Sequence, residues 1–239
     1  MSDHAQVPYR TASTLVTLLT LLLLGHVVVD SVACGSDWLE VNLLQPAMGE
    51  EIADEAWIAN SDRQQLIGVV QLVLTLPTAI IFLMWIYRAN VNARALGARD
   101  MTFRPGWSVG WFFVPILSLY KPFYAVQEIW KASIPGSQAW QSRRAGGVVG
   151  AWWTFWLLTC AASRISGRLS LQAEQINEFL VASWATLAAD GVAIPAALLA
   201  LLVVRGIHGL QERRADAAAG HLPEFASHDD EHQPLRQTG

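Results

Sequence analysis

Five polar residues that could do chemistry lie inside or beside long apolar runs of this chain: His26, Asp30, Gln71, Arg164 and Asp190. Ionisable side chains inside membrane-crossing helices are energetically costly, and they usually mark function or an internal ion pair. If the apolar runs form four antiparallel helices, these five residues come to comparable depth. Asp190 is the deepest, about 15 Å from the end of its helix at about 1.5 Å per residue. We therefore expect an intramembrane polar cluster.

The sequence leaves two interpretations of this cluster open. In the first, Asp190 and Arg164 form a structural ion pair. In the second, Asp190, Asp30 and His26 relay protons or a cation. Asp190 lies five residues before Pro195, at a point where a helix can bend.

No catalytic set of nucleophile, base and orienting residue can be named in the sequence. Walker, dinucleotide-binding, HExxH and nucleophile-elbow motifs are all absent from it. Two cysteines, Cys34 and Cys160, are too few for a thiolate metal site. The segment from His228 to His232 could chelate a divalent metal only adventitiously. We therefore expect no enzymatic activity, no cofactor and no metal site.

An ordered motif of Trp, Pro, Gly and charged residues lies between the second and third apolar runs. Its members are Trp85, Arg88, Asn92, Gly97, Pro105, Gly106, Trp107, Gly110, Trp111, Pro115, Pro122, Glu128 and Trp130. The i, i+3, i+7 spacing of Trp85, Arg88 and Asn92 places them on one helix face. We expect the Trp at headgroup depth, the Arg near lipid phosphate and the Asn bonded to free backbone groups. Glu128 could pair with Arg88 or a neighbouring arginine.

In the order of these residues the chain resembles a bacterial family of multi-pass membrane proteins, domain of unknown function 4328. The resemblance rests on the Trp-Arg-Asn face, a Leu-Gly pair, the P-G-W-x-V-G-W segment, further prolines and an E-x-W. It extends over roughly residues 60–210. It implies a membrane location and a similar topology, and it brings no activity, ligand or catalytic residue.

The composition points to a membrane protein, because 53% of the residues are apolar and only 15% are charged. A bilayer core of about 30 Å needs roughly 20 mostly apolar residues in a helix. Four runs meet this length, at about 12–33, 66–87, 146–163 and 180–204. We expect an all-α integral membrane four-helix bundle with a membrane domain at 12–211.

A fifth apolar stretch, 107–120, is short and is interrupted by Pro115. If this stretch is a re-entrant or interfacial segment, both termini fall on one side of the membrane. Only Arg63, Arg164 and Arg168 of the 16 Lys and Arg residues then lie on the opposite side. Because basic residues favour the cytoplasmic side, we expect four spans with both termini in the cytoplasm.

The remaining segments are expected to be loops and ends. Residues 1–11 form a cytoplasmic N-terminus, and the first apolar run is a retained anchor rather than a cleaved signal. The acidic stretch from Cys34 to Arg63 is predicted as a loop with a solvated acidic face. Spacing through Ile52 and Trp57 indicates that the second helix begins before the membrane. The tail, 212–239, is predicted to be disordered.

Two functions fit these features. The leading hypothesis is an accessory or interaction module of the cell membrane, whose cytoplasmic face docks a protein partner or anionic lipid. The alternative is a small transporter or channel built around the intramembrane polar residues. Either form could assemble as a homo-oligomer in the lipid bilayer, and nothing in the sequence points to nucleic acid.

Overall fold

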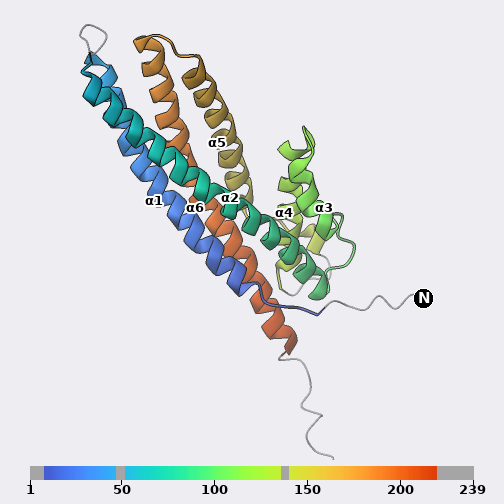
Figure 1. Ribbon diagram of the computed structural model, residues 1–239. Coiled ribbons are helices and arrows are strands. Elements are labelled where there is room, and N and C mark those ends of the chain that lie inside the picture. Colours follow the sequence, from blue (N-terminus) through green and yellow to red (C-terminus); the bar gives the residue numbers. More distant parts are fainter. Residues whose placement is uncertain (1–7, 47–51, 136–139, 220–239) are drawn as a thin grey trace, which may run out of the picture.

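The computed structural model describes residues 8–46, 52–135 and 140–219, and this part of the chain is helical without a β-strand (Figure 1). The four long helices are α1 (Ser13–Leu44), α2 (Asp54–Ala95), α5 (Gly147–Gln172) and α6 (Ile176–Ala219). Between α2 and α5 lie α3 (Pro105–Gly110) and α4 (Lys121–Ser133). Three 3-10 turns accompany them, η2 (Trp111–Phe113), η3 (Leu117–Leu119) and η4 (Trp140–Ser142). The expected all-α class is confirmed.

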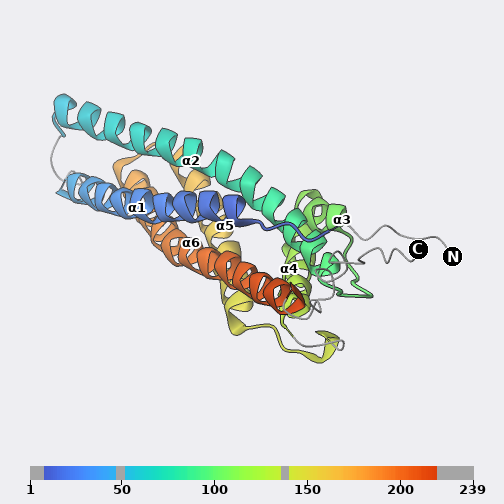
Figure 2. The same ribbon diagram turned by 90° about the horizontal axis from the view of Figure 1, so that it is seen from below.

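The four long helices alternate in direction, so the bundle has two distinct ends (Figure 1). We call the end with the start of α1 and the end of α6 the base. The apex is the opposite end, where α1 leads into α2 and α5 leads into α6. Seen from below, α3 and α4 also lie at the base (Figure 2).

Three of the helices, α1, α2 and α6, are long and apolar enough to cross a membrane. On one face of α2 the apolar side chains of Leu72, Val73, Leu76 and Ile80 are 58–66% exposed, as expected of a surface in contact with lipid. Helix α5 has 26 residues and therefore measures about 39 Å. This length also exceeds a bilayer core of about 30 Å.

The helices extend well beyond the predicted apolar runs. Most of the predicted acidic loop is helical, because α1 continues to Leu44 and α2 begins at Asp54. The prediction of a solvated acidic face is wrong for Asp37, whose side chain turns inward to α2 and leaves the residue 1% exposed. The start of the predicted disordered tail is also wrong, since α6 continues to Ala219. Residues 220–239, including the His228 to His232 segment, lie outside the described residues.

The segment 105–133 forms a hairpin that rises from the base beside α5 and turns back (Figure 1). At its tip Ile116 has φ 66°, in the left-handed region, and is 76% exposed. The indole Nε1 of Trp153 donates a 3.0 Å hydrogen bond to the carbonyl of Leu119, which ties the hairpin to α5. Trp156, against which Phe112 packs, is nine residues into α5, or about 14 Å along it. The hairpin therefore enters the bundle without reaching the apex.

The tightest packing lies in the lower half of the bundle. Trp85 is 1% exposed there and packs against Phe82, so its ring faces the protein interior. Helix α4 packs one face into this same core, where its Val126 and Ile129 are buried. These side chains form the hydrophobic core of the base.

Candidate functional site: a polar cavity inside the bundle

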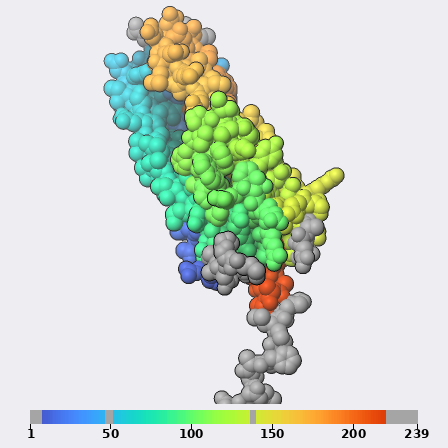
Figure 3. All heavy atoms as spheres, turned by 90° about the vertical axis from the view of Figure 1, so that its right-hand side faces the viewer, coloured from blue at the N-terminus to red at the C-terminus, as the bar shows by residue number. Residues whose placement is uncertain are grey.

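The four long helices do not close into a complete ring. Helix α1 packs against both α2 and α6, and α5 packs against α6, whereas α2 and α5 do not form a packed pair in the described chain. The hairpin lies over the side between α2 and α5 and covers its lower part (green in Figure 3). The bundle is therefore open on one flank.

A cavity of about 560 Å³ lies behind this flank. Small residues of α6 make room for it, at Ala193, Ala196, Ala197 and Ala200. Toward the base its wall is aromatic, with side chains of Phe82, Phe112, Phe113, Trp152 and Trp156. Toward the apex it becomes polar. Cavities of this size, mostly apolar with a few convergent polar groups, are typical of small-molecule sites.

The polar end is organised by one amide. Gln71 Nε2 donates to Asp30 Oδ1 at 3.1 Å and to Asp190 Oδ1 at 3.2 Å. His26 Nδ1 lies 3.9 Å from Asp30 Oδ2, one helical turn earlier on α1. Asp30 is only 4% exposed. A single neutral side chain thus joins two carboxyl groups from different helices.

The polar contacts continue from the cavity toward the apex, between α1 and α2. The carboxyl group of Asp37 lies beside that of Asp190, and its Oδ1 accepts from Gln64 Nε2 at 3.1 Å. Gln64 Nε2 also donates to Glu40 Oε2 at 2.7 Å. Asp37 Oδ2 is buried and has no hydrogen-bond donor. These residues make an acidic path from the cavity to the apex.

Arg63 is the basic residue on this path. Its Nε donates to Ser36 Oγ at 2.8 Å, and its Nη2 donates to the Asn60 side-chain oxygen. Asn60 in turn donates to Glu40 Oε1 at 3.1 Å. This network explains why α1 and α2 remain helical beyond the length that a membrane needs, because their polar side chains bond to each other.

The structure brings together four of the five residues expected in the cluster: His26, Asp30, Gln71 and Asp190. Arg164 does not join them. Ser163 lines the cavity, and a one-residue step along α5 turns the Arg164 side chain by about 100° to the exposed surface. The proposed ion pair between Asp190 and Arg164 is therefore not formed, and Asp190 bonds to Gln71 instead.

The polar residues Glu128 and Asn92 of the family motif form hydrogen bonds within the base. Glu128 is 8% exposed and accepts the backbone N–H groups of Thr102 at 2.7 Å and Phe103 at 3.0 Å. It does not pair with Arg88, because its two carboxylate oxygens are taken by this loop. Asn92 bonds to the backbone of Arg10, ahead of α1, rather than to the segment that follows α2.

Two important residues of the base were not predicted. Arg94 donates from Nη2 to the carbonyls of Met101 and Phe103, and from Nε to the side chain of Asn90. Asn90 Nδ2 donates to the carbonyl of Phe103 at 2.9 Å and to Ser108 Oγ at 2.8 Å. The available signal was their i, i+4 spacing at the end of the second apolar run.

Local backbone conformation explains most of the glycines and prolines of the motif. Gly97 has φ +90° and ends α2, where a left-handed residue is needed. Pro105 and Pro122 each lie in the first turn of a helix, where proline is well tolerated. Pro115 precedes the turn at Ile116. Nothing in the structure explains Gly106, since a Cβ there would meet no atom within 4 Å.

The tryptophans of the motif hold the hairpin and the base. The rings of Trp107 and Trp111 lie 4.7 Å apart, and Gly110 packs beneath Trp107. Lys121 Nζ lies 5.7 Å from the Trp111 ring centroid, within cation–π range. Trp130 fills the space above Gly206 of α6, where a Cβ would come within 2.5 Å of its ring.

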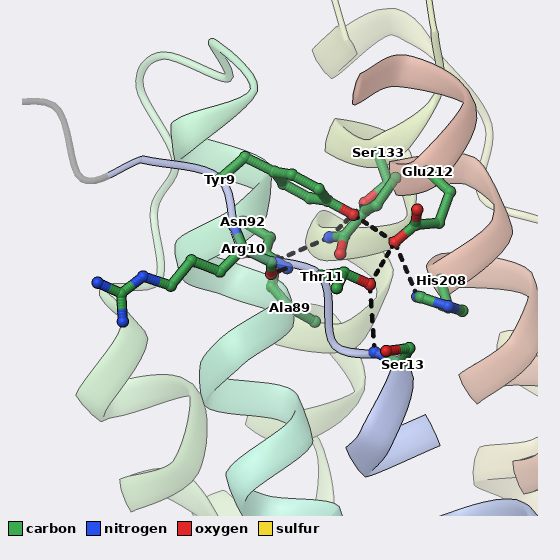
Figure 4. A network of polar contacts seen from close by, with 10 residues as sticks. Tyr9, Arg10, Thr11, Ser13, Ala89, Asn92, Ser133, His208 and Glu212 are labelled. Atoms are coloured by element: carbon green, nitrogen blue, oxygen red, sulfur yellow. Dashed lines mark hydrogen bonds and ion pairs between the residues drawn. The ribbon is translucent and has the colours of Figure 1, made fainter. Parts of the chain in front are cut away.

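The segment ahead of α1 is tied to the end of α6 (Figure 4). Tyr9 Oη and Thr11 Oγ1 both donate to Glu212 Oε1, at 2.6 and 2.7 Å, and His208 Nδ1 lies 3.7 Å from that oxygen. Burial and the hydrogen bond to Glu212 raise the pKa of Tyr9. The same hydrogen bonds lower the pKa of Glu212. A carboxylate and a neutral phenol therefore meet here at ordinary pH.

The model of the family described as domain of unknown function (DUF4328) matches residues 49–209. The chain belongs to the DUF4328 family. The match covers α2, the hairpin, α5 and most of α6, and so includes every residue of the motif. No curated protein and no solved structure matches the chain. For this DUF4328 member the case for a function therefore rests on the cavity and its surroundings.

Proposed function

We propose that this chain is a small multi-pass transporter of the cell membrane and that the cavity between its four long helices holds the solute. The observation that carries the proposal is the joining of Asp30 and Asp190 through Gln71 at the end of a cavity of about 560 Å³. Polar groups at membrane depth are costly, and a cavity lined by them is a common design for a transport site.

The orientation we propose places the base in the cytoplasm. The basic residues of the described chain gather at that end, among them Arg10, Arg94, Arg99, Arg205, Arg213 and Arg214. Arg63, Arg164 and Arg168 are the basic residues nearest the apex. This distribution follows the positive-inside tendency.

The hypothesis of an interaction module has less support. At the base, the polar side chains of Glu128 and Asn92 are bonded within the protein and are not free to bind a partner. We also propose that the protein catalyses no reaction, because the cavity lining contains no nucleophile placed beside a base and an orienting residue.

The test is to fill the cavity and measure transport. Ala193 lines the cavity one turn from Asp190, so Ala193→Phe should occupy solute space. Ala188 is exposed on the same helix, so Ala188→Phe is the matched control. Purified full-length protein in liposomes is assayed with a panel of radiolabelled organic cations, anions and neutral amphiphiles.

We expect protein-dependent flux of at least one class of solute, which Ala193→Phe abolishes and Ala188→Phe leaves intact. Flux that survives Ala193→Phe would place the pathway elsewhere, and the absence of flux for the whole panel would refute a transport role.

A further inference from the structure

We propose that the cavity takes a lipophilic organic cation, which enters from the bilayer between α2 and α5. This inference rests on the proposed function and adds the class of solute. It follows from three separate features of the cavity: the sign of its charge, the chemistry of its walls and the position of its opening.

The ionisable residues of the cavity lining are mostly acidic. Among the described residues that line it, the ionisable ones are Asp30, Asp190 and His26, and none is a Lys or Arg. Gln71 Nε2 donates a hydrogen bond to each of these two carboxyls. His26 lies 3.9 Å from Asp30, beyond ordinary hydrogen-bond length. Ionised carboxylates held away from water are costly, and a bound cation would offset this cost.

A third carboxyl strengthens this point. Asp37 is 1% exposed, lies beside Asp190 and keeps its Oδ2 without a donor. Three carboxyl groups therefore converge at this end of the cavity. Arg63 does not pair with Asp37, because its hydrogen bonds go to Ser36 and Asn60.

The walls favour an organic cation over a metal ion. No group of three or more His, Cys, Asp and Glu in the described chain is placed to hold a metal ion. The lower wall consists of aromatic rings, with Phe82 and Trp152 centroids 5.6 Å apart and Phe112 and Trp156 centroids 6.3 Å apart. Aromatic faces attract organic cations and also cover apolar substituents.

The opening faces lipid. Helices α2 and α5 meet through the rings of Phe82 and Trp152 toward the base but form no extended packed pair. Above this contact, the flank between them leads from the bilayer into the cavity. The hairpin covers the lower part of this flank (Figure 3), and its exposed apolar tip residues Phe113 and Ile116 can lie in lipid. A lipophilic cation that has partitioned into the bilayer can enter sideways without crossing the bundle.

The probe for the test is radiolabelled tetraphenylphosphonium, and tetraphenylborate is its counterpart of nearly the same shape and opposite charge. Binding is measured on the full-length protein in lipid nanodiscs. We expect saturable binding of the cation and none of the anion. The double variant Asp30→Asn, Asp190→Asn should weaken binding by about tenfold or more, since a charged partner is lost in a desolvated site. Asp62→Asn, on the exposed surface of α2, is the control and should bind normally.

A second variant keeps the test decisive if the double variant fails to fold. Gln71→Lys puts a built-in cation between the two aspartates, so the protein should stay folded and lose tetraphenylphosphonium binding. Binding that survives both changes, or no saturable binding in the wild type, would overturn the inference. Saturable binding of tetraphenylborate that is lost in Ala193→Phe would also overturn it, while leaving the proposed cavity function standing.

Discussion

At the scale of single residues, the base depends on close contacts that only particular side chains allow. Trp130 of the E-x-W motif lies over Gly206, and no other residue type fits beneath its ring. Glu128 accepts hydrogen bonds from two backbone N–H groups of the loop before α3, which water would otherwise have to satisfy. These contacts explain the motif residues as structural parts of the base.

The contact between Trp130 and Gly206 gives a prediction about stability. A methyl group at position 206 would lie within 2.5 Å of the Trp130 ring, so Gly206→Ala should lower the free energy of unfolding by about 1–3 kcal/mol. Gly209→Ala is the control, because a Cβ there meets no atom within 4 Å. It should be neutral or stabilise by up to about 1 kcal/mol through helix propensity. Thermal unfolding in detergent measures both, and equal effects of the two variants would contradict this packing.

The sequence identified the residues of the polar cluster better than it identified the side-chain contacts of the base. His26, Asp30, Gln71 and Asp190 were found because polar groups stand out in apolar runs. Arg164 was misplaced, because depth along a helix does not give the direction of a side chain. Asn90 and Arg94 were missed because polar residues beyond a span are common, and their partners are backbone carbonyls that no sequence pattern marks.

At the scale of elements, the segment ahead of α1 is held to α6 by hydrogen bonds to one carboxylate. Tyr9 and Thr11 both donate to Glu212, while Asn92 bonds to the backbone of Arg10. The pKa of Glu212 is lowered by these bonds. A lowered pKa means that this attachment is complete above the ordinary pKa of a glutamate. It is lost as the pH falls through the folded-state value.

We therefore expect the segment at 8–12 to detach at acid pH. The protection of these amides from hydrogen exchange, relative to an unfolded peptide at the same pH, should be high at neutral pH. It should fall below about pH 4, the ordinary range of a glutamate. Glu212→Gln should remove this pH dependence. Protection that is unchanged in Glu212→Gln at neutral pH would show that Asn92 alone holds the segment.

The elements were partly predictable for physical reasons. The apolar runs predicted four long helices, and a short, proline-broken stretch predicted the hairpin. The lengths of α1 and α2 were underestimated, because the polar residues that extend them bond across the helix pair, as Gln64 does with Asp37 and Glu40. Hydropathy detects burial in lipid, and it does not detect polar pairing between two helices.

At the scale of the whole molecule, the arrangement of helices creates the site. Three helix pairs pack closely and the fourth side stays open, so a cavity forms behind the hairpin with its carboxyl groups toward the apex. This opening could not be predicted from sequence, since which helices pack depends on the shapes of many side chains. The account requires that a membrane separates the base from the apex.

Cysteine labelling tests this claim most directly. Cys34 and Cys160 are first replaced, and then Ser170→Cys, near the apex, and Arg99→Cys, at the base, are introduced singly; both positions are exposed. Intact cells are treated with a membrane-impermeant thiol reagent, before and after permeabilisation. The account predicts labelling of Ser170→Cys in intact cells and of Arg99→Cys only after permeabilisation. Labelling of both positions in intact cells would contradict it, because base and apex would then lie on the same side of the membrane.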